Sequence, residues 1–223
     1  MTRTVLVVAA HTDDEALGCG GTIAKHVVQG DTVYAVFLAD GVTSRTDASE
    51  LELTERNSAA QKAHRILGIK QSFMLGFPDN RMDTVPLLDI VQKLEQVIDD
   101  VQPQIVYTHH NGDLNIDHRI SHQATLTACR PVPGSPVREI YTFEVLSSTE
   151  WNASSVDPFL PNVFVDISAQ LETKMQALAE YELEMRDPPH SRSIVNATRL
   201  AELRGSSVGL GAAEAMMAVR VIC

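Results

Sequence analysis

Four short apolar runs alternate with longer segments of helical periodicity along the first 130 residues. The runs are rich in Val, Ile, Phe and Tyr, as expected of strands that are covered on both faces. They occupy residues 4–10, 32–39, 72–75 and 105–108, and the helical segments lie at about 15–28, 50–67, 86–100 and 119–130. This alternation predicts an α/β fold, Rossmann-like, with a mostly parallel sheet and helices on both faces.

The rest of the chain continues with fewer and less regular elements. Strands are predicted at 139–146 and 162–167 and helices near 168–185 and 194–204, after which 205–211 leads into a short apolar segment. Pro188 and Pro189 keep their surroundings out of a helix and predict an exposed loop at 187–193. Because no internal repeat, low-complexity tract or linker interrupts the pattern, we expect a single domain over residues 1–223.

Polar side chains crowd directly after the first predicted strand. Residues 10–15 read Ala-His-Thr-Asp-Asp-Glu, which brings one imidazole and three carboxylates together. The turn from strand to helix puts His11, Asp13 and Asp14 at the carboxyl end of the sheet, where open α/β folds place their sites. Neighbouring carboxylates repel unless a cation or proton intervenes, so a metal site is one interpretation and simple capping of the helix is the other.

A second polar cluster follows the strand predicted at 105–108. Residues 109–118 read His-His-Asn-Gly-Asp-Leu-Asn-Ile-Asp-His. Because two strand ends of a parallel sheet can face each other, His118 could complete a set with His11 and Asp14. Two imidazoles and one carboxylate with an open position are ligands of a catalytic zinc, and the same set describes a non-haem iron site.

These two clusters resemble the motifs of a known family, the LmbE/PIG-L-type metal-dependent N-deacetylases. The first cluster resembles the family's Ala-His-Pro-Asp-Asp-Glu motif, with Thr12 in place of the proline. The second is similar to its His-Pro-Asp-His motif, in which Asp117 and His118 match and Asn115 stands where the family has a histidine. The resemblance covers roughly residues 4–145.

The resemblance implies roles for individual residues. His11, Asp14 and His118 would hold one zinc ion per chain, and Asp13 would be the general base acting on the metal-bound water. In the family, the first histidine of the second motif helps to stabilise the oxyanion, and the following aspartate, here Asp117, orients it.

Four further residues are candidates for contact with the substrate or the oxyanion. Arg56 begins a segment similar to the family's arginine-led helix that ends in Leu-Gly, and it is a candidate to bind an anionic or hydroxyl-rich substrate group. A solvated helix arginine is the alternative. Asn115 can donate a hydrogen bond to an oxyanion but cannot carry positive charge. If a cationic partner is needed, His190 and Arg192 of the loop predicted at 187–193 are the candidates.

We therefore expect a hydrolase that removes an N-acyl group, most often N-acetyl, from an amino sugar or glycoconjugate. Two interpretations from other classes stay open at this point. A non-haem iron oxygenase would use the same ligands, and a non-catalytic glycan-binding module on this fold would not need Asp13.

Composition restricts the partners. The formal net charge is −11 and no basic run occurs, which argues against a nucleic-acid partner. The three cysteines are far apart, which fits the reducing cytoplasm, and we expect neither a signal peptide nor a membrane span. The expected partner is a small N-acetylated sugar, and a homo-oligomer is possible.

The glycine-rich stretch Gly18-Cys19-Gly20-Gly21 does not fit a dinucleotide fingerprint, because Ile23 stands where the third glycine belongs. We expect these glycines instead to let the first helix pack close to the sheet.

At the start of the second cluster, His109 and His110 point to opposite faces, so at most one of them should face the site.

Overall fold

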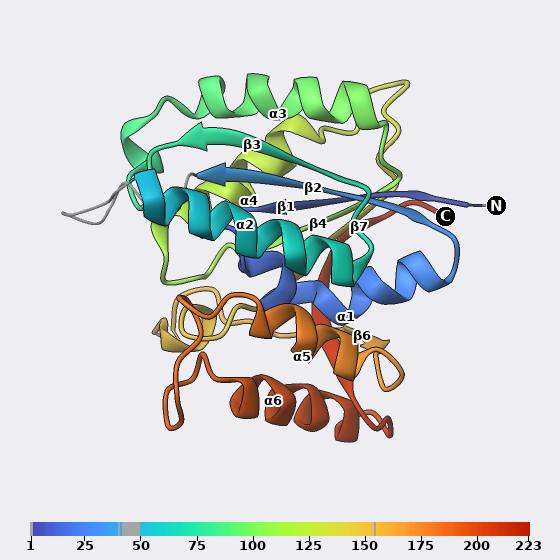
Figure 1. The fold of residues 1–223 in the computed structure, drawn as a ribbon. Helices are drawn as coiled ribbons and strands as arrows, with labels where there is room; N and C mark the ends of the chain where they lie inside the picture. The colour runs from blue at the N-terminus through green and yellow to red at the C-terminus, as the bar shows by residue number, and fades with distance from the viewer. Residues whose placement is uncertain (1, 40, 42–49, 154) are drawn as a thin grey trace.

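The computed structural model describes residues 2–39, 41, 50–153 and 155–223 (Figure 1). Its strands are β1 (Thr4–Ala9), β2 (Thr32–Ala39), β3 (Gln71–Phe77), β4 (Ile105–His109), β5 (Glu139–Phe143), β6 (Val163–Asp166) and β7 (Ala213–Val221). Its helices are α1 (Asp14–Val28), α2 (Glu50–Leu67), α3 (Leu87–Val101), α4 (Ile116–Ala128), α5 (Leu171–Ala179) and α6 (Ile194–Ser206). Two short 3-10 turns, η1 (Met82–Thr84) and η2 (Thr149–Trp151), complete the elements.

All seven strands form one sheet in the order β3-β2-β1-β4-β5-β7-β6. The strands from β3 to β5 are parallel, and β7 runs antiparallel to both of its neighbours, β5 and β6. From β1 the chain proceeds outward to β2 and β3 and then returns to the other side of β1 with β4. The carboxyl ends of β1 and β4 therefore flank the point where the strand order reverses, which is where open α/β sheets bind ligands.

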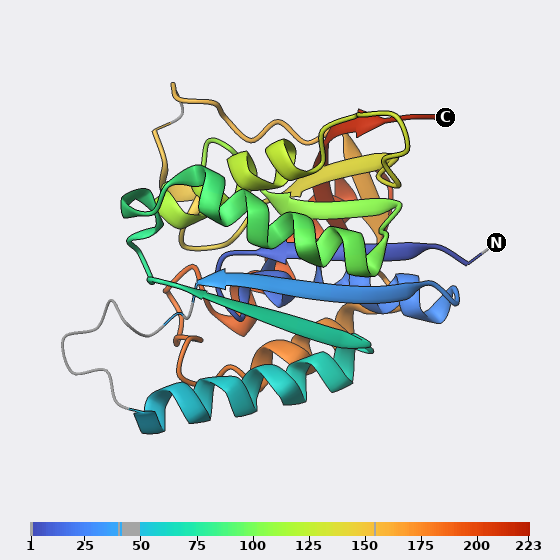
Figure 2. The ribbon, with the colours of Figure 1, turned by 90° about the horizontal axis from the view of Figure 1, so that it is seen from above.

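Helices cover both faces of the sheet, as the sequence predicted. Along β1, Leu6 and Val8 pack into a core with α3 and α4, whereas Val5 and Val7 pack into a second core with α1, α2 and α5. Figures 1 and 2 show these layers, with α6 as an outer helix beyond α5 and both termini at the end of the sheet opposite the carboxyl ends of β1 and β4. Among the described residues, no helix has the length and apolar character needed to cross a membrane.

Several element boundaries differ from the sequence prediction. Strands β3 and β5 cover residues 71–77 and 139–143 instead of 72–75 and 139–146, and three further differences are larger or affect the site. The apolar segment near the end is the strand β7, whose pairing with β5 and β6 depends on residues far away in the chain. The helix predicted at 168–185 ends at Ala179, because the chain then turns and the hydroxyl of Tyr181 donates to Glu15 (2.6 Å). Helix α4 begins at Ile116, earlier than predicted, because the side chain of Asn115 caps it.

Glycines bring α1 close to the sheet, as predicted. A Cβ atom at Gly18 would overlap the ring of Phe143 on β5, and one at Gly21 would lie 2.8 Å from the side chain of Ile167, which follows β6. Any larger residue would push the helix away from the sheet. The glycines therefore determine how closely α1 packs against the sheet.

Candidate active site

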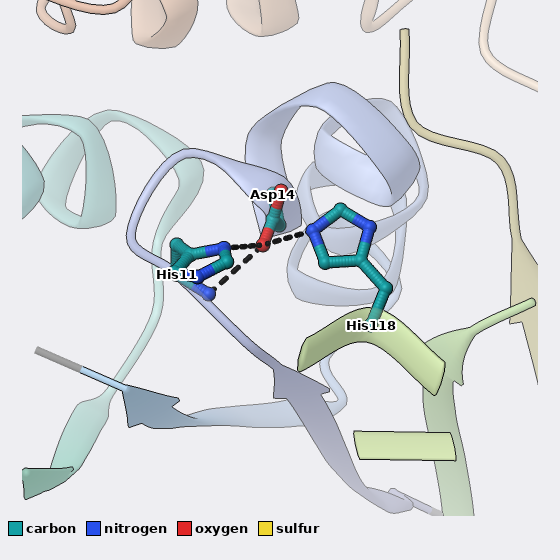
Figure 3. A group of neighbouring side chains, drawn as sticks. All are labelled: His11, Asp14 and His118. Atoms are coloured by element: carbon teal, nitrogen blue, oxygen red, sulfur yellow. Dashed lines mark hydrogen bonds and ion pairs between the residues drawn. The ribbon is translucent and has the colours of Figure 1, made fainter. Parts of the chain in front are cut away.

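The two polar clusters meet at the carboxyl ends of β1 and β4. Asp14 Oδ2 lies 3.2 Å from His11 Nδ1 and 3.3 Å from His118 Nε2, and all three residues are buried. One ligand atom from each of the three lies within 4.8 Å of the others, and Figure 3 shows both rings turned toward the carboxylate of Asp14. Two imidazole nitrogens and one carboxylate oxygen are a donor set that suits a divalent ion such as zinc.

Two further carboxylates face the other side of the His11 ring. His11 Nε2 lies 3.0 Å from Asp79 Oδ1 and 3.2 Å from Asp117 Oδ2. Asp117 also accepts hydrogen bonds from the backbone N–H groups of Asn80 (2.6 Å) and Met82 (3.0 Å). Ligating histidines are usually oriented by such a carboxylate on the opposite ring nitrogen, so Asp79 and Asp117 are suited to hold His11 in place.

His118 has the same kind of support from Asp113. His118 Nδ1 lies 3.2 Å from Asp113 Oδ1, and Asp113 also accepts hydrogen bonds from the hydroxyls of Ser148 and Thr149. Burial lowers the pKa of His118, but the carboxylates of Asp14 and Asp113 outweigh it and raise the pKa to about 9. The surrounding carboxylates thus favour positive charge at this point, as a cation site requires.

Sequence reasoning missed both Asp79 and Asp113. Asp113 lies within the second polar cluster, so its place in the motif was a usable signal. Asp79 follows β3 in the sequence Phe77-Pro78-Asp79, and nothing local distinguishes it from a turn residue.

Asp13 lies beside the three converging side chains in an unusual backbone conformation. Its φ of 117° is in the left-handed region, which costs energy for a residue with a Cβ atom. Its backbone N–H donates to Glu15 Oε2 (2.9 Å), which holds the turn. Burial raises the pKa of the Asp13 carboxyl to about 7, with Asp14 adding to the rise and the guanidinium of Arg192 opposing it. Such a carboxyl can exchange a proton near neutral pH.

Two arginines flank the Asp13 carboxylate. Arg192 Nη1 donates to Asp13 Oδ2 (2.9 Å), and Arg56 Nη2 lies 3.7 Å from Asp13 Oδ1. Arg56 also donates to the side chain and carbonyl of Thr12 (both 2.9 Å) and pairs with Glu184. Arg56 is therefore a buried part of the site and not a solvated helix residue. Glu184 was not singled out from the sequence.

The side chains of Asp13, Arg56 and Glu184 line a polar cavity of about 180 Å³ together with those of His11 and His118. Asn115 borders it, where its Nδ2 donates to Asn80 Oδ1 (3.1 Å) and its Oδ1 accepts from the N–H of Asp117 (2.8 Å). Arg192 also lines the cavity, whereas His190 is exposed and is not among the lining residues. His190 Nδ1 instead accepts from the backbone N–H of Arg192 (3.0 Å).

Only one of the two adjacent histidines at the end of β4 contacts the site. His109 stacks on His118 with 3.9 Å between ring centroids, and its Nε2 accepts from the N–H of Ala10 (2.8 Å). His110 contacts the carbonyl of Asp157 instead (2.6 Å). Burial and the neighbouring His118 hold the pKa of His109 well below its usual range. His109 is thus a neutral ring that packs behind His118.

Comparison with known proteins identifies the family of the chain. Residues 6–129 match the family described as PIG-L: GlcNAc-PI de-N-acetylase. The chain is 32% identical over 185 residues to the Escherichia coli protein named uncharacterized deacetylase YaiS, covering 80% of this chain and 90% of that protein. It is 29% identical over 201 residues to 4-oxalmesaconate hydratase of Pseudomonas putida, covering 79% of this chain and 72% of the hydratase.

Solved structures share the fold. That of N,N'-diacetylchitobiose deacetylase from Pyrococcus horikoshii superimposes with a TM-score of 0.78 at 20% identity, covering 98% of this chain and 84% of that one. The family match spans more than half of the chain and includes both polar clusters. The chain belongs to the PIG-L family of N-deacetylases.

Proposed function

We propose that this protein is a zinc-dependent N-deacetylase that removes an acetyl group from an amino sugar or glycoconjugate. The observation that carries the proposal is the convergence of His11, Asp14 and His118 beside Asp13, a buried carboxyl with a raised pKa. The family description, which names a GlcNAc-containing substrate, supports an N-acetylated sugar.

His11, Asp14 and His118 are the residues that would hold one divalent ion. Their donor atoms are the types that zinc prefers, and buried carboxylates support both rings. When bound, such an ion lowers the pKa of water and polarises an acyl oxygen.

Asp13 is the proposed general base. Its carboxylate would accept the proton of the attacking water and later return it to the leaving amine, a reuse that acid–base catalysis allows. Its pKa of about 7 suits both steps. Asp117 would orient His11 and the start of α4, because it contacts the ring and the turn at Asn80.

Asn115 and Arg192 are the candidate oxyanion partners. The Asn115 amide lines the cavity, and one of its two N–H donors is bonded to Asn80. Arg192 carries a charge that an amide lacks, and it approaches Asp13 directly. Arg56, held by Thr12 and Glu184, is the proposed contact for an anionic or hydroxyl-rich group of the substrate.

Replacing Arg192 by Ala should lower kcat/KM at least tenfold, about 1.4 kcal/mol, without changing metal content. The reason is that Arg192 is the candidate cation that lines the cavity beside Asp13. The same assay with His190→Ala and Asn115→Ala separates the candidates. If both loop variants match the native enzyme while Asn115→Ala is strongly impaired, the neutral amide is sufficient and the role of the loop is refuted.

The activity itself is tested by loading the native protein with zinc and measuring amine release from a panel of N-acetylated sugars. Release from at least one sugar is expected. Because a relative is named as 4-oxalmesaconate hydratase, loss of absorbance from an unsaturated tricarboxylic acid of this type with no amine release would replace this proposal. Sugar binding without turnover would indicate a glycan-binding module, and tightly bound iron would favour the oxygenase.

We further propose that residues 1–223 form one domain in the cytoplasm. In support, β1 and β7, the first and last strands of the described residues, belong to one sheet. All three cysteines are free, which suits a reducing compartment. The oligomeric state would follow from light scattering.

A further inference from the structure

Helix α1 is broken in its middle. Cys19 has φ −145° and ψ 24°, so the residues before and after it form two short helical pieces. A break removes backbone hydrogen bonds on both sides, and sharp kinks have identifiable causes. The first piece matters for function because its beginning carries Asp13 and Asp14.

A buried ion pair occupies this break. Lys174 Nζ donates to the carbonyl of Leu17 (2.8 Å), at the end of the first piece. Glu214 accepts from the N–H groups of Gly21 (2.9 Å) and Thr22 (2.7 Å), at the start of the second piece. Lys174 Nζ and Glu214 Oε1 are themselves 2.6 Å apart. The cation thus caps a carboxyl-terminal helix end and the anion an amino-terminal end, as the helix dipoles favour.

The pair comes from two elements that are remote in sequence. Lys174 lies on α5 and Glu214 on β7, and each residue is 4% exposed. Removing two charges from water is expensive, and an unbroken helix with apolar neighbours would avoid that cost. The break is a kink in α1 between the piece that carries Asp14, which packs against Phe143 of β5 at Gly18, and the piece that follows Cys19.

We propose that Lys174 and Glu214 are positioning residues for catalysis. They fix the direction of the first piece of α1 and so place Asp13 and Asp14 against His11, which follows β1, and His118 on α4. Neither residue lines the polar cavity of the candidate active site, so both act through the helix. The part of this inference that concerns metal rests on the proposed zinc site.

The test compares Lys174→Met, Glu214→Gln and the double variant with the native full-length protein. We measure the zinc dissociation constant by competition with a chromophoric chelator, kcat at saturating zinc and substrate, and hydrogen exchange of residues 14–22 in the metal-free protein. Each single variant should weaken zinc binding at least tenfold, lower kcat, and speed exchange in 14–22. Because both residues act on one break, the double variant should lose little more than either single one.

Arg204→Met provides the matched control. It removes a half-buried pair, Arg204 with Glu144 (2.7 Å), which borders the same small cavity as Lys174 and Glu214. Among the described residues, the Arg204 guanidinium donates to Glu144 and to no backbone atom of α1. It should leave zinc affinity, kcat and exchange in 14–22 as in the native protein. Should Lys174→Met fail to fold, Glu214→Gln still decides, since glutamine keeps the volume and one acceptor oxygen.

A purely structural role predicts a different result. The melting temperature of the variants would fall while zinc affinity, kcat and local exchange stayed native, and that result would overturn the proposal. If the native protein bound no zinc, the proposed metal site would fail, and the exchange measurement would still decide the role of the pair.

Discussion

Asp13→Asn is expected to keep the bound metal and lose 10²- to 10⁴-fold in turnover, the usual range for a positioned general base. An amide has nearly the same shape as the carboxyl but cannot accept the proton of the attacking water. Steady-state kinetics at saturating substrate, together with elemental analysis of the variant, measure both quantities.

The pH profile of the native enzyme provides a second check on Asp13. Burial raises the pKa of this carboxyl to about 7, and a divalent cation beside Asp14 would lower it from there. A base must be deprotonated to act, so activity should fall as the pH drops through a value at or below about 7. Near-normal turnover by Asp13→Asn would refute the role, and joint loss of metal and activity would make Asp13 a ligand.

His118→Ala is expected to abolish stoichiometric zinc binding and, with it, nearly all activity. It removes one of three ligand atoms that lie within 4.8 Å of one another. A chelator should inactivate the native enzyme, and added zinc should restore it.

His122 offers a matched control for this experiment. It lies on the same helix, is also buried, and its Nδ1 donates to the carbonyl of His109 (2.9 Å). His122→Ala should keep one zinc ion per chain. Full metal content in a folded His118→Ala variant would show that the proposed ligand set is wrong.

The sequence was sufficient to predict the central part of the fold and the meeting of the two polar clusters. The buried strands could be predicted because a strand that is covered on both faces has mostly apolar residues. In β1, for example, both faces pack into apolar cores. The proximity of His11 and His118 followed from a general property of parallel sheets, whose carboxyl ends lie along one edge.

Other parts of the site depend on contacts that have no local signal. Glu184 lies in a stretch with helical periodicity, and only the end of α5 at Ala179 frees it to reach Arg56. Nothing in the local sequence distinguishes Lys174 and Glu214 from surface charges. Their ion pair depends on the packing of α5 and β7 against α1. Such pairs form between elements far apart in sequence, which a local pattern does not encode.

The position of β7 has a consequence for how the chain folds during synthesis. The edge strand β6 pairs with β7, and Glu214 joins Gly21 across 193 positions of sequence. A ribosome releases the chain residue by residue, so β1 to β4 can begin to assemble before the carboxylate of Glu214 is available to the break in α1. Contacts across so many residues form slowly. The outer edge of β5 also stays unpaired until residues 213–221 have been made and form β7. The turn after β1, which carries the proposed metal ligands, is therefore made well before the strand that supplies the last contacts to α1.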